Sequence, residues 1–133
     1  MKFTMIFSVV ALMAVGSLTA SAKDDNGGTR EQMVAVNDAY IPNGFDSSSD
    51  AFVVINGLFP NTCYKIKESK VTHVGAALHE VRTTAMVTEG LCLTVLVPFS
   101  KEVQLGKLDA GKHLLRFVNG DGTFWDKSLT IEN

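Results

Sequence analysis

Short apolar segments recur along residues 33–133 at intervals of about ten residues, and this spacing limits the chain to a small set of folds. The segments are rich in Val, Ile, Thr, Phe and Leu, and clusters of Gly, Pro, Asn and Ser separate them. Their bounds are Met33–Val36, Ala51–Ile55, Cys63–Lys67, Val71–Gly75, Glu80–Val87, Leu91–Val97, Glu102–Leu105, His113–Val118 and Thr123–Ile131. The pattern predicts an all-β protein, an immunoglobulin-like Greek-key β-sandwich of about seven to nine strands.

Side chains alternate within these segments as they do in half-buried strands. Val81, Thr83 and Ala85 fall on one face, and Arg82 and Thr84 fall on the other. Residues after position 22 show no apolar stripe with the helical period of about 3.6 residues. We therefore expect strands throughout this part of the chain.

Turn-forming residues indicate where the strands end. Asn119-Gly120-Asp121-Gly122 lies between two strand segments and predicts a hairpin. Pro98 is expected to end the strand Leu91–Val97, because proline cannot donate a hydrogen bond to a β-ladder.

The N-terminus has the pattern of a cleaved secretory signal, residues 1–22. Lys2 precedes an apolar run over residues 3–14, and Ala20-Ser21-Ala22 offers small residues for cleavage after Ala22. The apolar run is shorter than the roughly 20 residues that a membrane span needs. We expect an exported protein, periplasmic or extracellular, and the simple signal suggests a bacterial source. Residues 23–32 are polar and are expected to form a flexible leader before a single domain over residues 33–133.

Charge and hydropathy exclude two classes of partner. The formal net charge of −2 does not supply the positive field that sequence-independent binding of nucleic acid requires. No apolar run after residue 22 has the length of a membrane span. We therefore expect no nucleic-acid partner and no membrane span after the signal.

Cys63 and Cys92 are the two cysteines of the chain. An even count in a small exported domain predicts a disulfide bond. The bond would close a loop of about 30 residues and stabilise the fold by roughly 3–4 kcal/mol. A redox pair or a thiolate metal site is the alternative, but redox pairs usually have the closer Cys-x-x-Cys spacing.

Several motifs resemble those of a known family. Leu108-x-x-Gly111-x-His113 resembles the Leu-x-x-Gly-x-Tyr corner of Greek-key sandwiches, with His113 in place of Tyr. Further matching motifs are Tyr40-Ile41-Pro42-x-Gly44-Phe45-Asp46, Gly57-x-Phe59-Pro60-Asn61-x-Cys63-Tyr64, Cys92, Pro98-Phe99, Val103-x-Leu105-Gly106-x-Leu108 and Val118-Asn119-Gly120. Over most of residues 36–120 the chain resembles a family of exported bacterial immunoglobulin-like domains. The resemblance implies the fold and the disulfide, but the family has no assigned activity. The change of Tyr to His113 leaves the hydrogen bond of the corner open.

The chain has three histidines, His73, His79 and His113. His73 and His79 are six residues apart, so both could face one side of a single strand. Gly75-Ala76-Ala77 instead predicts a break into a hairpin, in which the two could still be cross-strand neighbours. No carboxylate or thiol cluster accompanies them, so we expect two exposed strand histidines and no metal site. We expect no cofactor, and we expect a structural role for His113 at the corner.

Residues near the loops are candidates for binding. Tyr40, Phe45 and Trp125 lie near loop or hairpin positions, and Asp46 lies within the 42–50 loop. Exposed aromatic side chains on rigid loops make good contact residues. The same aromatic side chains can instead close the open ends of a sandwich.

The sequence contains no recognisable catalytic motif. It has no Gly-x-Ser-x-Gly elbow and no phosphate-binding glycine loop followed by a helix. We therefore expect a non-catalytic exported module that binds a protein or a glycan. Two alternatives stay open: a small protease inhibitor that acts through the 42–50 loop, and a hydrolase or metal-binding protein whose site is assembled from distant strands.

Overall fold

A computed structural model describes residues 28–133; the expected signal peptide and residues 23–27 of the expected leader lie outside this range. Eight strands and no helix are found in the described part of the chain, which confirms the all-β prediction. The strands are β1 (Thr29–Val34), β2 (Asp38–Tyr40), β3 (Ala51–Phe59), β4 (Tyr64–His73), β5 (Leu78–Thr88), β6 (Val97–Gly106), β7 (Gly111–Val118) and β8 (Phe124–Ile131). Over residues 28–133, no helix has the length and hydropathy of a membrane span.

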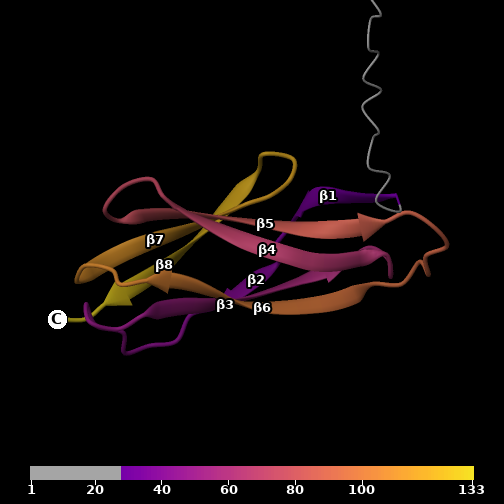
Figure 1. Cartoon of the computed structure of the whole chain (residues 1–133). Helices are drawn as coiled ribbons and strands as arrows, with labels where there is room; N and C mark the ends of the chain where they lie inside the picture. The colour runs from indigo at the N-terminus through magenta and orange to yellow at the C-terminus, as the bar shows by residue number, and fades with distance from the viewer. Residues whose placement is uncertain (1–27) are drawn as a thin grey trace, which may run out of the picture.

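The strands form two sheets that lie one above the other as a sandwich (Figure 1). The large sheet has β5 at its centre: β4 pairs along one edge of β5, and β1 and β7 pair with the two halves of the other edge. β8 extends this sheet beyond β7. The small sheet has the order β2-β3-β6. The β5–β7 pair is parallel, whereas the other strand pairs are antiparallel.

The core lies between the sheets and follows the alternation of the strands. In β5, the even-numbered residues, which include Arg82 and Thr84, point outward. Val81 and Ala85, on the other face, are buried, in agreement with the alternation of the sequence. Ile55 from β3 and Leu115 and Phe117 from β7 are completely buried. Each such side chain stabilises the fold by about 1.5–3 kcal/mol relative to an exposed position. The expected hairpin at residues 119–122 is confirmed, and it joins β7 to β8.

The prediction of a strand at Leu91–Val97 is wrong. Residues 89–96 form a loop, and β6 begins at Val97. The Cys63–Cys92 disulfide and the hydrogen bonds to Thr62 hold this segment against the turn before β4, so its backbone does not join a ladder. An apolar run without strict alternation does not by itself distinguish a strand from such a loop.

Pro98 also differs from its prediction, because it lies inside β6 instead of ending a strand. β6 is the edge strand of the small sheet and pairs only with β3, so an edge position can accommodate a residue without an N–H. Residues 29–32 of the expected leader belong to β1, which pairs with β5 along the large sheet. The two segments Cys63–Lys67 and Val71–Gly75 are joined into one bulged strand, β4.

Candidate functional site

The cysteines and the histidines, which have the most distinctive side-chain chemistry, lie at the two ends of the β4–β5 hairpin. Cys63 immediately precedes β4, and His73 is its last residue, about 30 Å away along an extended strand. We call residues 60–63 with the 89–96 loop the cysteine end. We call His73, His79, His113 and residues 107–110 the histidine end. In Figure 1 the 89–96 loop follows the arrowhead of β5, while the β4–β5 turn lies at the opposite end of these strands.

The predicted disulfide between Cys63 and Cys92 is formed, with a Cα–Cα distance of 5.5 Å. Two hydrogen bonds support it: the Leu93 amide donates to Thr62 Oγ1 at 2.9 Å, and the Thr62 amide donates to the Leu93 carbonyl at 3.2 Å. The Thr88 amide, at the end of β5, donates to the Cys63 carbonyl at 3.0 Å. The 89–96 loop is therefore fixed at both its start and its middle.

This braced loop presents aliphatic side chains to solvent. Leu91 is fully exposed, and Leu93, Val95 and Leu96 are 70%, 52% and 67% exposed. These four exposed aliphatic side chains lie between positions 91 and 96, which makes the loop a candidate contact surface. This surface could not be recognised from the sequence pattern, because the same apolar residues match the pattern of a strand. The position of Cys92 within the run was the available signal, since a disulfide there draws the segment toward Cys63.

Phe45 and Asp46, two candidate contact residues, make contacts within their own region. The Phe45 ring packs edge-to-face on Phe52 with centroids 5.3 Å apart, and its carbonyl accepts from the Glu132 amide at 2.8 Å. The Asp46 carboxylate accepts hydrogen bonds from the Ser48 amide, the Ser48 hydroxyl and the Ser49 hydroxyl. These bonds, the Ser48 hydroxyl first, lower the pKa of Asp46. Both residues thus stabilise the 42–50 loop against the C-terminal strand.

Tyr40 and Trp125, the other two candidates, differ in exposure. Trp125 is half-buried, stacks on Phe117 with centroids 4.4 Å apart, and donates from Nε1 to the Val36 carbonyl at 2.8 Å. It therefore packs against the core and ties β8 to the segment after β1. Tyr40, on β2, is 63% exposed and remains available for contact. Phe45, Asp46 and Trp125 thus bond within their own loop, to the C-terminal strand or against the core, and Tyr40 alone of the four candidates is an exposed aromatic side chain.

The three histidines form a continuous hydrogen-bonded chain at the other end. His73 and His79 are cross-strand partners on either side of the β4–β5 turn, and their Nδ1 atoms lie 2.6 Å apart. His79 Nε2 lies 2.8 Å from His113 Nδ1, and the two rings stack with centroids 5.0 Å apart. His113 Nε2 donates to the Asp109 carbonyl at 2.6 Å. The chain thus joins β4, β5, β7 and the segment before β7.

The expectation of two exposed histidines is wrong for His79, which is 2% exposed, whereas His73 is exposed. Alternation was the available signal, since His79 lies two residues before Val81 on the buried face of β5. Burial lowers the pKa of His79, and the nearby charges of His73 and His113 lower it further. The neutral form of His79 is therefore favoured in the folded protein.

The Leu108, Gly111 and His113 corner has a defined geometry. Leu108 is buried, and Gly111 has φ of 129°, a conformation that side chains with a Cβ rarely adopt. Through Nε2, His113 makes the return hydrogen bond to backbone that the corner Tyr makes in the resembling sandwiches. Histidine differs from Tyr in one respect: its second ring nitrogen is free to bond His79.

A small pocket of about 210 Å³ lies beside this chain. His73, His79, Lys107, Leu108 and Asp109 contribute to its lining, together with Gly75 and Ala76. The lining contains an imidazole that can accept a proton but no Ser, Thr or Cys that could act as a nucleophile. Over residues 28–133, no three His, Cys, Asp or Glu side chains are grouped to hold a metal ion.

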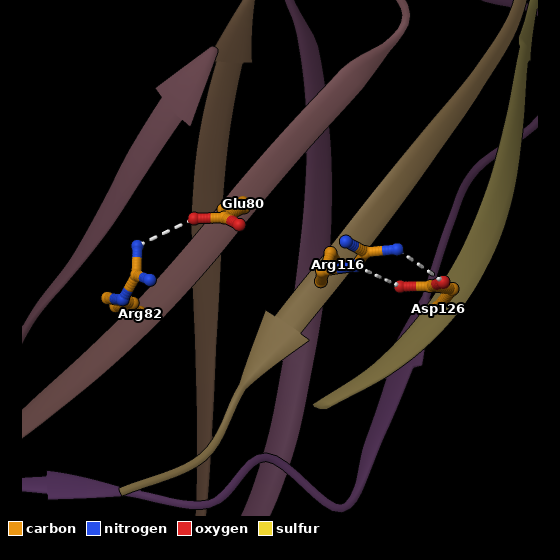
Figure 2. A network of polar contacts seen from close by, with 4 residues as sticks. All are labelled: Glu80, Arg82, Arg116 and Asp126. Carbon is orange, nitrogen blue, oxygen red and sulfur yellow. Dashed lines mark hydrogen bonds and ion pairs between the residues drawn. The ribbon is translucent and has the colours of Figure 1, made fainter. Parts of the chain in front are cut away.

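Outside both ends, charged side chains cross the outer face of the large sheet (Figure 2). Arg116 donates to both oxygens of Asp126, from Nε at 3.0 Å and from Nη2 at 3.2 Å, and Arg82 donates to Glu80 at 2.8 Å. The bonds to Asp126 raise the pKa of Arg116. The Arg116 guanidinium also lies 4.1 Å from the ring centroid of Phe124. These charged side chains, which we call the charged row, pair with one another. The charged row therefore has the properties of an outer face in contact with solvent.

Comparison with known proteins gives one informative match. No curated protein and no solved structure is significantly similar to the chain. The profile of one family, described as ORF11 beta-sandwich domain, matches residues 53–125. This range is more than half of the sequence and includes both cysteines and all three histidines. The chain therefore belongs to the ORF11 beta-sandwich domain family.

Proposed function

We propose that this protein is a non-catalytic interaction module that binds another protein through the 89–96 loop. The observation that carries the proposal is the exposure of Leu91, Leu93, Val95 and Leu96 on a loop fixed by a disulfide. Water-exposed aliphatic side chains weaken solubility and add nothing to the core. Their presence on a rigid support is best explained by a partner that buries them.

The bracing of the loop supports this role energetically. Binding costs about 0.5–1.5 kcal/mol for each flexible side chain that it orders, and ordering a loose loop costs more. The disulfide and the two hydrogen bonds to Thr62 already order the backbone before any partner arrives. More of the free energy from burying the leucines is then available as affinity.

The chemistry of the loop favours a protein over a glycan or a lipid surface. Glycan sites need aromatic platforms and polar groups, and residues 89–96 contain no aromatic side chain. Membrane-surface segments combine apolar residues with Lys, Arg or Trp, and none of these occurs in the loop. A complementary apolar groove on a protein accommodates four aliphatic side chains and one Thr.

We further propose that the module acts after export, in the periplasm or outside the cell. A disulfide persists in oxidising compartments, and the pattern of residues 1–22 is that of a secretory signal. Cleavage after Ala22 would leave the residues that form both sheets intact. N-terminal sequencing of the protein recovered from each cell fraction tests both the cleavage position and the compartment.

The binding proposal is tested by site-specific photo-crosslinking in the producing cells. A crosslinking side chain at position 91 should capture one defined protein, and the same group at position 72 on β4 should not. The combined change Leu91→Asn and Leu93→Asn should abolish the captured band when the group is placed at position 95. The matched control is Val74→Asn, which changes an exposed aliphatic side chain in the β4–β5 turn, at the opposite end of β4 from the loop.

Three results would contradict the proposal. Capture that is equally strong with the group at position 72 would show no preference for the loop. A captured band that survives the double loop change would place the contact elsewhere. Crosslinking only to lipid would replace the protein partner with a membrane surface.

A further inference from the structure

We propose that His73, His79 and His113 form a latch that holds the histidine end closed with at most one extra proton and opens when a second proton is bound. The proposal rests on the geometry of the hydrogen-bonded chain and is independent of the 89–96 loop. It assigns to this end of the sandwich a response to acidic surroundings, a property that the interaction proposal does not require.

The direction of every hydrogen bond in the chain is set by the Asp109 carbonyl. A carbonyl oxygen only accepts, so His113 must carry its proton on Nε2 at 2.6 Å from that oxygen. In a neutral His113 the other nitrogen, Nδ1, then accepts, and His79 donates to it from Nε2. His79 Nδ1 in turn accepts from His73 Nδ1. The neutral chain therefore has one permitted set of tautomers, with His73 in the Nδ1–H form.

This arrangement has room for one additional proton. The unoccupied position is Nε2 of His73, on the one exposed ring of the chain. A proton bound there makes His73 cationic and strengthens the hydrogen bond that it donates to His79, because charged donors form stronger bonds. The excess charge can also shift along the two ring contacts without breaking a hydrogen bond, since each contact still holds one proton.

A second additional proton has no such place. It must put an N–H on both sides of a ring contact, either His73–His79 at 2.6 Å or His79–His113 at 2.8 Å. Two donors that face each other at these distances repel, and the rings must separate. The unfolded chain has no such limit, because each of its histidines binds a proton independently with a pKa near 6.5.

The charged groups around the chain do not relieve this repulsion within the buried part. His73 faces His79 from β4 and His113 faces it from β7, and Lys107 and Asp109 line the adjoining pocket. Lys107 adds positive charge. Asp109 is exposed and uses its backbone oxygen in the chain, and Glu80 is bonded to Arg82 on the outer face of the sheet.

Opening would release a defined set of contacts. The Leu114 amide donates to the Ala77 carbonyl at 2.7 Å, and this bond joins the β4–β5 turn to β7 beside the latch. Separation of His79 from either neighbouring ring would also widen the pocket, because His73 and His79 line it together with residues 107–109. The cysteine end, at the far end of β4, would remain closed by its covalent bond.

The first experiment measures the tautomers of the unaltered protein. Nitrogen-15 NMR of the imidazole rings at about pH 7.5 should show His73 as Nδ1–H and both His79 and His113 as Nε2–H. In water an isolated histidine side chain prefers the Nε2–H form, so the His73 assignment is specific to the hydrogen-bonded chain. His73 in the Nε2–H form would overturn the proposal, and this outcome does not depend on any variant folding.

The second experiment compares hydrogen exchange at the two ends as the pH falls from about 7.5 to about 5.5. After correction for intrinsic rates, the protection of the Leu114 amide should fall at least about tenfold, since binding one further proton shifts an opening equilibrium by up to about tenfold per pH unit. The protection of the Thr88 amide, which bonds Cys63 at the other end, should change less than about twofold. Equal changes at both amides would overturn the latch.

His79→Gln is the matched variant for that comparison, because it removes the ring that both contacts of the chain share. Gln does not bind a proton in this pH range, so no contact between two imidazole rings remains. The pH dependence of Leu114 protection should drop to that of Thr88 in this variant. An unchanged pH dependence would assign the effect to groups outside the chain and would refute the proposal.

Discussion

The two ends of the sandwich are closed by different kinds of bond, and each bond faces a different environment. At the cysteine end, one covalent bond fixes a loop whose apolar side chains point into solvent. At the histidine end, three imidazoles are linked by hydrogen bonds, and two of them are buried. The first closure depends on redox conditions and the second on pH. One end therefore offers a permanent surface, and the other offers a closure that conditions can change.

The largest effect is expected from removing the disulfide by the paired change Cys63→Ala and Cys92→Ala. The bond spans a sequence separation of 29 residues. Its loss should lower the free energy of unfolding by about 3–4 kcal/mol, because the unfolded chain regains the entropy of an open loop. Urea titration measures this change. Crosslinking through position 91 should weaken in the same variant, while the tautomers of the histidine chain should stay unchanged. A loss below about 1 kcal/mol would mean that the hydrogen bonds to Thr62 already hold the loop.

The second effect is expected from His79→Phe, which removes the middle of the latch but keeps an aromatic ring in the core. At about pH 7.5 the free energy of unfolding should fall by about 1–3 kcal/mol, because His113 Nδ1 loses its donor in a buried position. Urea titration at several pH values measures the change.

The pH dependence of this loss has a definite sign. Burial lowers the pKa of His79, so the folded protein binds fewer protons than the unfolded chain. The stability that neutral His79 provides is complete above about pH 6.5 and is lost as the pH falls through its lowered pKa. The difference between the native chain and His79→Phe should therefore narrow toward about pH 5.5. If the difference in the free energy of unfolding does not change with pH, protonation of the histidines is not linked to folding.

A smaller effect is expected at the charged row of Figure 2, which belongs to neither end. Asp126→Asn removes the charge that pairs with Arg116 on the outer face. The expected loss is smaller than that of His79→Phe, because solvent screens pairs that are partly exposed. The loss should shrink further in about 1 M salt, where the Debye length is near 3 Å. Unfolding measured with and without salt tests this, and a loss comparable to that of the disulfide would contradict the solvated character of this face.

The sequence was sufficient to predict the features that depend on local patterns. The period-two alternation of β5, the turn at residues 119–122 and the single cysteine pair all have local signals. The sequence was insufficient where a long-range contact overrides the local pattern. The apolar residues 91–96 match a buried strand, but the bond from Cys92 to Cys63 places them in a solvent-exposed loop.

The histidine chain shows the same limit in another form. The turn residues were enough to predict a hairpin between His73 and His79, because a turn has a local signal, but they left the contact of the two rings open. His113 is 34 residues from His79, and only the parallel pairing of β5 with β7 brings the two rings together. Parallel pairing requires a long connection and has no local sequence signal. The candidate sites were therefore predicted in their local parts and missed where two distant segments meet.

The smallest effect on stability is expected where the effect on binding is greatest. The combined change Leu91→Asn and Leu93→Asn replaces two exposed side chains that have no share in the core. The free energy of unfolding should stay within about 0.5 kcal/mol of the native value, as for most surface substitutions. Affinity for the partner captured at the loop should fall at least about tenfold, because buried leucines at an interface are worth more than about 1 kcal/mol. If the free energy of unfolding instead falls by several kcal/mol, the two leucines pack against the sandwich in solution. The cysteine end would then present no apolar contact surface to a partner.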